Sequence, residues 1–312
     1  MLAQVVRSGV VEAQHDGAVA VVDGDGKLIT SSGDIDRPYL IRSAAKPFQA
    51  MAALEAGAEL TPEELAVACA SHGGQPIHVA FVRSMLAAGG LDESALRCPP
   101  SWPLGESARD RVLAAGHRAP RRVWYNCSGK HAGMLRACVA SGWPIDSYLH
   151  PEHPLQVAIR DELAAVGGDG LGEPAVDGCG APIYRFTTRQ LASAYALLAT
   201  ADRYRPIRSA LERYGPLSAH SELLSGPSRH WGVAAKGGAE GCIGLAVRNR
   251  IGVGIKSFDG SNRPLGPVVA DVMTQLGAAP GLTRERWLPT FVAPTYGGGK
   301  PVGEVESVVT LS

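Results

Sequence analysis

The residues in this sequence that are best suited to catalysis are its lysines. Only six of the 30 basic residues are lysines, and one of them, Lys46, follows Ser43 by three positions. Arginine stays protonated in a protein, whereas a buried lysine can lose its proton and act as a base. A serine beside such a lysine can become a nucleophile for acyl transfer without a histidine. This spacing makes Ser43 and Lys46 a candidate catalytic pair.

The same pair has a plain structural interpretation. Ser43 precedes a helical stretch, so it can cap that helix while Lys46 extends into solvent from the first turn. The catalytic interpretation uses the same position differently, because backbone N–H groups at a helix start can stabilise an oxyanion. Both interpretations stay open on the residues alone.

Three further segments hold candidates for the same chemistry. Ser71 lies in a glycine-rich loop, residues 70–75, which either caps a helix or brings backbone donors close to a ligand. Lys256 follows a predicted strand and could serve either serine as a base or as an electrostatic partner. Lys236 begins a Lys-Gly-Gly run that is similar to the Lys-x-Gly strand of penicillin-recognising enzymes. For either lysine, a plain surface role is an equal alternative.

Two cysteines, Cys127 and Cys179, lie in polar loops. A pair of thiolates suits zinc, but a zinc site needs three or four ligands, and the sequence has no Cys-x-x-Cys. The third ligand would have to be His131, Asp177 or a neutral Lys130. Unliganded loop cysteines are the alternative.

The pattern of elements predicts an α+β protein. Residues 3–31 are predicted as a β-hairpin with its turn at residues 23–26. Strands are predicted again at 242–248, 251–257 and 303–311, with a helix near 265–277. Between these ends, helices are expected at residues 47–56, 62–70, 76–88, 130–141, 154–166, 188–200 and 205–213.

Strands at both ends of the chain predict one sheet built from both termini, with a helical region inserted between them. We expect a single domain, residues 1–312, with two lobes. The sheet lobe would comprise residues 1–45 and 230–312, approximately, and the helical lobe residues 46–229.

Composition limits the kind of partner. The chain is 45% hydrophobic and 19% charged, with a formal net charge of zero, so it offers no basic stripe for nucleic acid and no polybasic cluster for a membrane. No secretory signal or bilayer-length apolar run is recognisable, and six cysteines in a chain of 312 residues indicate reduced thiols. A cytoplasmic protein with a small-molecule substrate is expected.

Six blocks of sequence, taken in order, resemble the L-asparaginase II family of the rhizobial type. The resemblance implies a serine β-lactamase-like fold and hydrolysis of L-asparagine to L-aspartate and ammonia. It also implies a homodimer. The blocks are residues 42–49, 70–74, 126–131, 177–180, 235–241 and 256–263.

The resemblance further implies roles for particular residues. Two Ser–Lys pairs carry over as Ser43 with Lys46 and Ser71 with Lys256, and we favour Ser43 as the nucleophile with Ser71 as a proton relay. A zinc ion that modulates substrate binding would be held by Cys127, Lys130 and Cys179. Arg42, His131 and Asp177 would line the same pocket and bind substrate.

Two other functions stay open. A glutaminase or another small-amide amidase differs from an asparaginase by as little as one methylene in the substrate, which a pocket discriminates by only ~1–3 kcal/mol. A non-catalytic zinc or thiol sensor would keep the metal ligands while the serines are merely structural.

Overall fold

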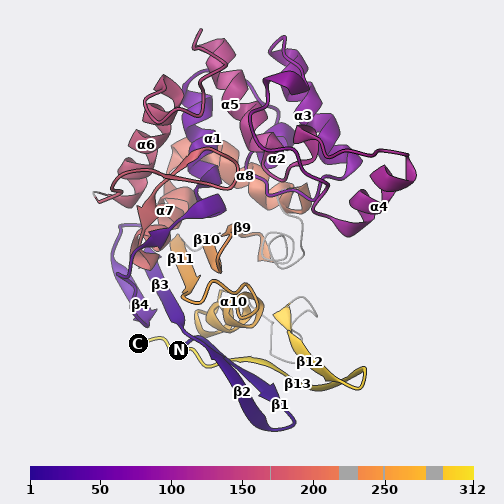
Figure 1. Cartoon of the computed structure of the whole chain (residues 1–312). Coiled ribbons are helices and arrows are strands. Elements are labelled where there is room, and N and C mark those ends of the chain that lie inside the picture. The colour runs from indigo at the N-terminus through magenta and orange to yellow at the C-terminus, as the bar shows by residue number, and fades with distance from the viewer. Residues whose placement is uncertain (169, 218–230, 249, 279–290) are drawn as a thin grey trace.

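The computed structural model describes residues 1–168, 170–217, 231–248, 250–278 and 291–312. A helical region lies above a region of sheets in Figure 1. The α-helices are α1 (Lys46–Glu55), α2 (Pro62–Ala68), α3 (Pro76–Ala88), α4 (Glu106–Ala114), α5 (Ser128–Ala140), α6 (Pro154–Gly167), α7 (Thr188–Thr200), α8 (Arg205–Arg213) and α10 (Leu265–Gln275). The 3-10 helices are η1 (Arg42–Ala45), η2 (Glu93–Ala95), η3 (Arg122–Trp124), η4 (Asp202–Tyr204) and η5 (Gly215–Leu217).

A five-stranded antiparallel sheet joins the two ends of the chain in the order β4-β3-β11-β10-β9. The link between the ends is the pairing of β3 with β11, in which Val19 lies opposite Ile255. The strands are β3 (Gly17–Asp23), β4 (Leu28–Ser32), β9 (Ala234–Gly238), β10 (Cys242–Val247) and β11 (Ile251–Ser257).

Helices cover both faces of this sheet. On one face, α7 lies so close to β11 that a Cβ at Gly252 would come within 2.0 Å of the carbonyl oxygen of Ala192. Glycine is therefore required at that position by space rather than by backbone conformation. On the other face, α10 packs Val268 and Val269 into a core with Val253 of β11.

A second, four-stranded antiparallel sheet corrects the expectation of a single one. Its order is β12-β13-β1-β2, so it too combines both ends of the chain. The N-terminal segment forms two hairpins instead of one, because Ser8 and Gly9 turn the chain with positive φ angles of 48° and 80°. The strands are β1 (Ala3–Arg7), β2 (Val10–His15), β12 (Pro294–Gly297) and β13 (Lys300–Ser307).

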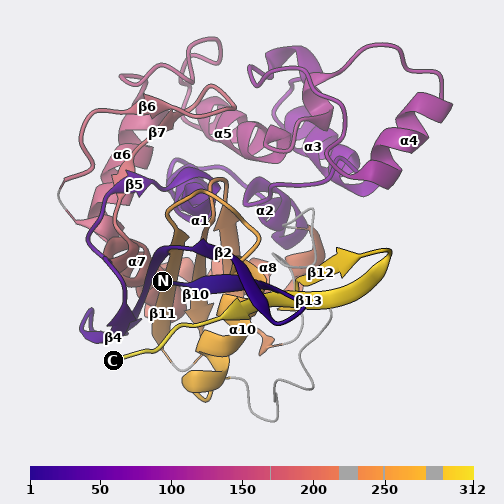
Figure 2. The same cartoon turned by 60° about the horizontal axis from the view of Figure 1, so that its bottom comes forward.

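The helical region holds a separate core in which α1 packs against α5 and α6, and α2 and α3 pack against α5 (Figure 2). Helix α4 was not expected, because only Ala108 of its nine residues is buried and the segment has little apolar periodicity. Two short ribbons, β5 (Tyr39–Leu40) with β8 (Arg185–Phe186) and β6 (Ala175–Val176) with β7 (Pro182–Ile183), link the loops.

The α+β architecture with antiparallel sheets drawn from both ends of the chain is therefore confirmed. The extent of the two lobes stays a prediction, and its boundary at residues 229 and 230 lies outside the described residues. Each predicted helix overlaps an observed one, with ends that agree to within two residues.

Candidate active site

Lys46 is completely buried and points at the loop that carries Ser71. Its side chain is 0% exposed. The ammonium nitrogen donates a hydrogen bond to Ser71 Oγ at 3.0 Å and another to the carbonyl oxygen of Ala70. The solvated first-turn lysine is thus the wrong interpretation. Lys46 lies at the start of α1 and reaches across to the segment that follows α2.

Lys236, on the edge strand β9, contacts the same hydroxyl. Its side chain is 1% exposed, and its nitrogen lies 3.1 Å from Ser71 Oγ and 2.6 Å from the carbonyl oxygen of Gly237. Burial, reinforced by the charge of Lys46, lowers the pKa of Lys236 to about 7. Ser71 therefore bridges two buried lysines, one of which loses its proton near neutral pH.

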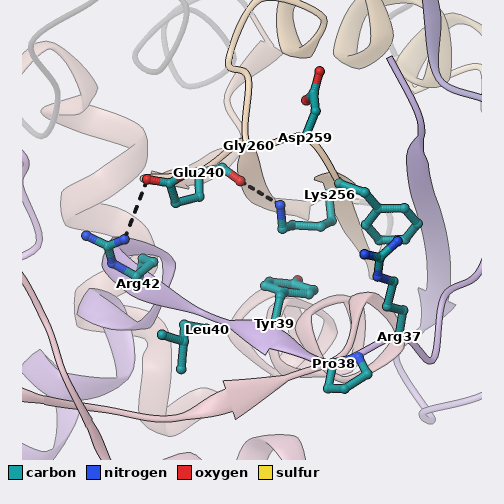
Figure 3. Close-up of a pocket in the computed structure, with 10 residues that line it drawn as sticks. Arg37, Pro38, Tyr39, Leu40, Arg42, Glu240, Lys256, Asp259 and Gly260 are labelled. Carbon is teal, nitrogen blue, oxygen red and sulfur yellow. Dashed lines mark hydrogen bonds and ion pairs between the residues drawn. The ribbon is translucent and has the colours of Figure 1, made fainter. Parts of the chain in front are cut away.

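The pairing of Ser71 with Lys256 stays a prediction. Lys256 donates hydrogen bonds to the backbone carbonyl oxygens of Glu240 and Ser257, while Lys236 donates to Ser71. Lys256 lines a separate pocket next to Arg42 and Glu240, as Figure 3 shows.

Ser43 stands in η1, immediately before α1, and is half-buried. The residue that caps α1 is Ala45, so Ser43 is not the helix cap that the plain interpretation proposed. Strand β9 passes directly against this turn. A Cβ at Gly238 would lie 3.0 Å from the carbonyl oxygen of Ile41 and 3.2 Å from the amide nitrogen of Ala44. Ser43 and Lys236 are thus held by two elements in contact.

The two loop cysteines meet in the structure. Cys127, at the start of α5, and Cys179 are both buried, and their thiols are hydrogen bonded to each other. Lys130 Nζ lies 3.0 Å from Cys179 Sγ and 4.0 Å from Asp177 Oδ2. The hydrogen bond with Cys127, helped by Lys130, holds the pKa of Cys179 far below its usual range. Burial by itself lowers the pKa of Lys130, because it disfavours the charged form. The neighbouring Cys179, Cys127 and Asp177 together outweigh this effect, so the pKa is raised.

These donors fit a zinc ion. In the described part of the chain, no three His, Cys, Asp or Glu side chains are placed to hold a metal, so a metal here needs the lysine as a ligand. Two soft thiolates and one amine in contact are a suitable set of three protein ligands, with a fourth position left open. Lys130 must lose its proton to take part.

Two of the three residues expected to bind substrate, Arg42 and Asp177, connect the turn that holds Ser43 to the thiol centre. Arg42 donates from Nε to Asp177 Oδ1 at 2.8 Å, and Asp177 Oδ2 lies 3.4 Å from Cys179 Sγ. Arg42 adopts a positive φ of 50°, which is uncommon for a residue with a side chain and is found at functional sites. His131 hydrogen bonds through Nδ1 to the hydroxyl of Tyr148 at 2.6 Å.

One further residue was missed by sequence reasoning. His72 is fully buried, with Nε2 3.0 Å from Ser128 Oγ and Nδ1 accepting from the amide of Gly74 at 3.1 Å. Since Ser128 donates its only proton to the carbonyl oxygen of Val123, His72 must be neutral and protonated at Nε2. Burial lowers its pKa well below the ordinary value. This contact ties the Ser71 loop to α5, and the sole signal for it was its place next to Ser71.

Comparison with protein families identifies the family to which the chain belongs. The L-asparaginase II family matches residues 3–307, nearly the whole chain. The chain therefore belongs to the L-asparaginase II family. A comparison with curated proteins gave no match. Among the described helices, none has the length and apolar character that crossing a bilayer requires.

Several solved structures are similar in fold. A beta-lactamase from Mycobacterium bovis is 17% identical, with a TM-score of 0.44 over 84% of this chain and 95% of that one. Mglu in its tris and glutamate form is 16% identical, with a TM-score of 0.41 over 90% of this chain. A Bacillus glutaminase is 15% identical, with a TM-score of 0.38 over 86% of this chain and 93% of that one. The chain spans only 64% of that Mglu chain, and such low TM-scores say nothing about function.

Proposed function

We propose that the protein hydrolyses L-asparagine to L-aspartate and ammonia, with Ser43 as the nucleophile. The observation that carries the proposal is Ser71 between two buried lysines, beside the turn that holds Ser43. Two buried ammonium groups on one hydroxyl repel each other. The pair therefore carries only one positive charge, from one ionising proton, near neutral pH. One lysine is then a base and the other an acid in the same centre.

The reaction follows from this shared proton. In the productive state the single positive charge of the pair lies on Lys236. Ser43 Oγ attacks the side-chain amide carbon of the substrate, and its proton passes to Lys46. The C–N bond breaks as the leaving nitrogen takes a proton from Ser71, which Lys236 replaces, so ammonia departs and an acyl-serine ester is left. Water then attacks the ester, and its proton passes through Ser71 to Lys236. Lys46 returns its proton to Ser43, so L-aspartate is released and both lysines regain their starting states.

Arg42 and Asp177 supply charges of both signs for a zwitterionic amino acid, and His131 adds a polar edge to the same network. A zinc ion held by Cys127, Lys130 and Cys179 would add a positive charge that tunes substrate binding.

We also propose a homodimer in the cytoplasm. All six cysteines are free and buried in the structure, which supports a reducing compartment. The mass of the purified protein by light scattering tests the dimer: a mass near 65 kDa, about twice that of the 32.6 kDa chain, supports it, and 32.6 kDa excludes it.

Ammonia release from L-asparagine and L-glutamine, measured for the wild type, Ser43→Ala and Ser71→Ala with zinc content determined on each, tests the proposal. Asparagine turnover that disappears in Ser43→Ala at equal zinc content supports it. Turnover that survives Ser43→Ala moves the nucleophile to Ser71, and a preference for L-glutamine makes the protein a glutaminase. No amide hydrolysis by a zinc-loaded wild type would favour the sensor.

A further inference from the structure

A second pocket lies beside the serine centre and has no part in the reaction above. It has a volume of about 280 Å³ and is lined by residues 37–40, Arg42, Glu240, Lys256 and residues 258–260 (Figure 3). Neither serine lines it. Its volume matches a small metabolite rather than a drug-sized ligand.

Lys256 is a buried cation that faces this pocket. The residue is only 6% exposed, and its ammonium donates to the backbone carbonyl oxygens of Glu240, at 2.6 Å, and Ser257. It lies 5.4 Å from the centre of the Tyr39 ring. In the part of the chain that the structure describes, the hydrogen bonds of this ammonium go to backbone carbonyls and no carboxylate lies within 4 Å of it. Buried charges in proteins are usually paired with an opposite charge. Among the described residues, no anion is in contact with the ammonium of Lys256, so the site suits a bound anion.

The two acidic residues of the pocket are engaged elsewhere. Asp259 accepts hydrogen bonds from the hydroxyl of Ser257 and from His15, each at 2.6 Å, and its carboxylate points away from Lys256 in Figure 3. Glu240 has a largely exposed side chain that lies 3.9 Å from Arg42. Neither carboxylate neutralises Lys256 at contact distance.

Arg37 adds a second cation on the same side. Its guanidinium lies 4.4 Å from the centre of the Phe258 ring. Burial lowers the pKa of Lys256, and the charge of Arg37 contributes to lowering it. Stacking on an aromatic ring holds a guanidinium in place and leaves its N–H groups free to donate. A planar carboxylate matches such a fork, with the ammonium of Lys256 as a second contact.

We propose that this pocket binds the carboxylate of a small organic acid, with Lys256 as its buried counter-charge and Arg37 as its second donor. Because Arg42 contacts both Glu240 at the pocket and Asp177 at the thiol centre, these two sites share one side chain. The proposal does not depend on the proposed function, since binding can be measured without turnover.

Calorimetric titration with succinate, a dicarboxylate without an amide to cleave, tests the proposal on the whole protein. We expect binding by the wild type, at least about tenfold weaker binding by Lys256→Gln, weaker binding by Arg37→Gln, and no loss in Lys27→Gln, which replaces an exposed lysine. Lys256→Arg keeps the charge and should bind within about threefold of the wild type, which separates lost charge from lost folding.

Two other ligands sharpen the result. Succinamide has the same shape without the charge and should not bind. L-Aspartate shows whether the natural ligand is an amino acid. If it binds more tightly than succinate, the pocket favours an amino acid; if it does not, the pocket favours a simple carboxylic acid. In either case binding should be lost when Lys256 is replaced. The proposal is overturned if succinate does not bind at millimolar concentration, if Lys256→Gln binds it as the wild type does, or if succinamide binds equally well.

Discussion

Two buried centres in this protein shift the pKa of a lysine in opposite directions. In the serine centre, Lys236 faces Lys46 and the hydroxyl of Ser71, and its pKa falls to about 7. In the thiol centre, Lys130 faces Cys179, and its pKa rises above the ordinary value. All three lysines are almost completely buried, so burial alone does not explain the difference.

The charges next to each lysine determine the direction in which its pKa shifts. Desolvation disfavours the charged form of any buried lysine, but an anion in contact outweighs it and a second cation adds to it. The serine centre therefore contains a base near neutral pH, which acyl transfer needs. The thiol centre contains a fixed positive charge, which zinc must displace. The following tests begin with the largest expected effect.

Replacing Lys46 should break the serine centre. Lys46→Met removes the base that takes the proton of Ser43, and residues that act as a unit in catalysis lose about 10⁴-fold or more in kcat when one is removed. Steady-state ammonia release measures this. The exposed Lys300→Met is a matched control and should keep wild-type kcat. A loss below about tenfold in Lys46→Met would show that Lys46 is not the base.

Replacing Lys130 should weaken zinc binding at the thiol centre and leave the serine centre intact. Lys130→Met removes one of three protein ligands, and we expect zinc affinity to fall by more than about 100-fold, since even residues that only support the ligands account for 10–100-fold. Competition with a chromophoric chelator measures the affinity. In the wild type, binding should also weaken as pH falls, because protons compete for the thiolates and for Lys130. Unchanged zinc affinity in Lys130→Met would remove lysine from the ligand set.

The pH dependence of turnover should report the shared proton. As pH falls through about 7, Lys236 becomes protonated, neither lysine of the pair is then neutral, and kcat should fall about tenfold per pH unit. Lys236→Met removes the lysine whose pKa is lowered, so the acid limb near pH 7 should disappear, with kcat reduced about 10²-fold at pH 7. An acid limb at the same pH in both proteins would contradict the coupling.

The smallest expected effect is on stability, and it concerns the loop next to Ser71. Burial lowers the pKa of His72 well below its usual value and that of His78 to about 4. Since the unfolded chain binds protons at these histidines below about pH 6.5 and the folded chain does not, unfolding becomes easier as pH falls from 6.5 towards 4. We expect a loss of about 1 kcal/mol per histidine per pH unit once below pH 6, measured by urea unfolding. His72→Gln should flatten this slope, whereas the exposed His150→Gln should leave it unchanged.

Much of the fold is predictable from local patterns. Helices such as α3 and α7 have long apolar periodicity and clear starts, Pro76 at the first turn and the Thr187 capping box, so their bounds follow from the sequence. Helix α4 buries almost nothing and leaves no such pattern. The division of the strands into two sheets depends on pairing between β1 and β13, about 300 residues apart, which no local pattern records.

The candidate site divides in the same way. Ser43 and Lys46 can be recognised as a pair because they lie one helical turn apart in the sequence. Cys127 and Lys130 can be recognised for the same reason. The partner of Ser71 is a long-range contact, and both Lys236 and Lys256 lie on glycine-rich strands of one sheet. Which of them faces Ser71 depends on the position of each strand relative to α2, so the contact between Lys236 and Ser71 could not be predicted from the sequence.

The most direct test of the contrast between the two centres is the titration of the lysines themselves. With only six lysines in the chain, ¹³Cε-lysine labelling and NMR resolve each side chain, and Lys236→Met and Lys130→Met assign the two that matter. In metal-free protein, the Lys236 resonance should titrate near pH 7, while the Lys130 resonance should stay in its charged form beyond pH 10. If no lysine of the serine centre titrates below pH 9, the centre holds no base near neutral pH and the proposed mechanism is wrong.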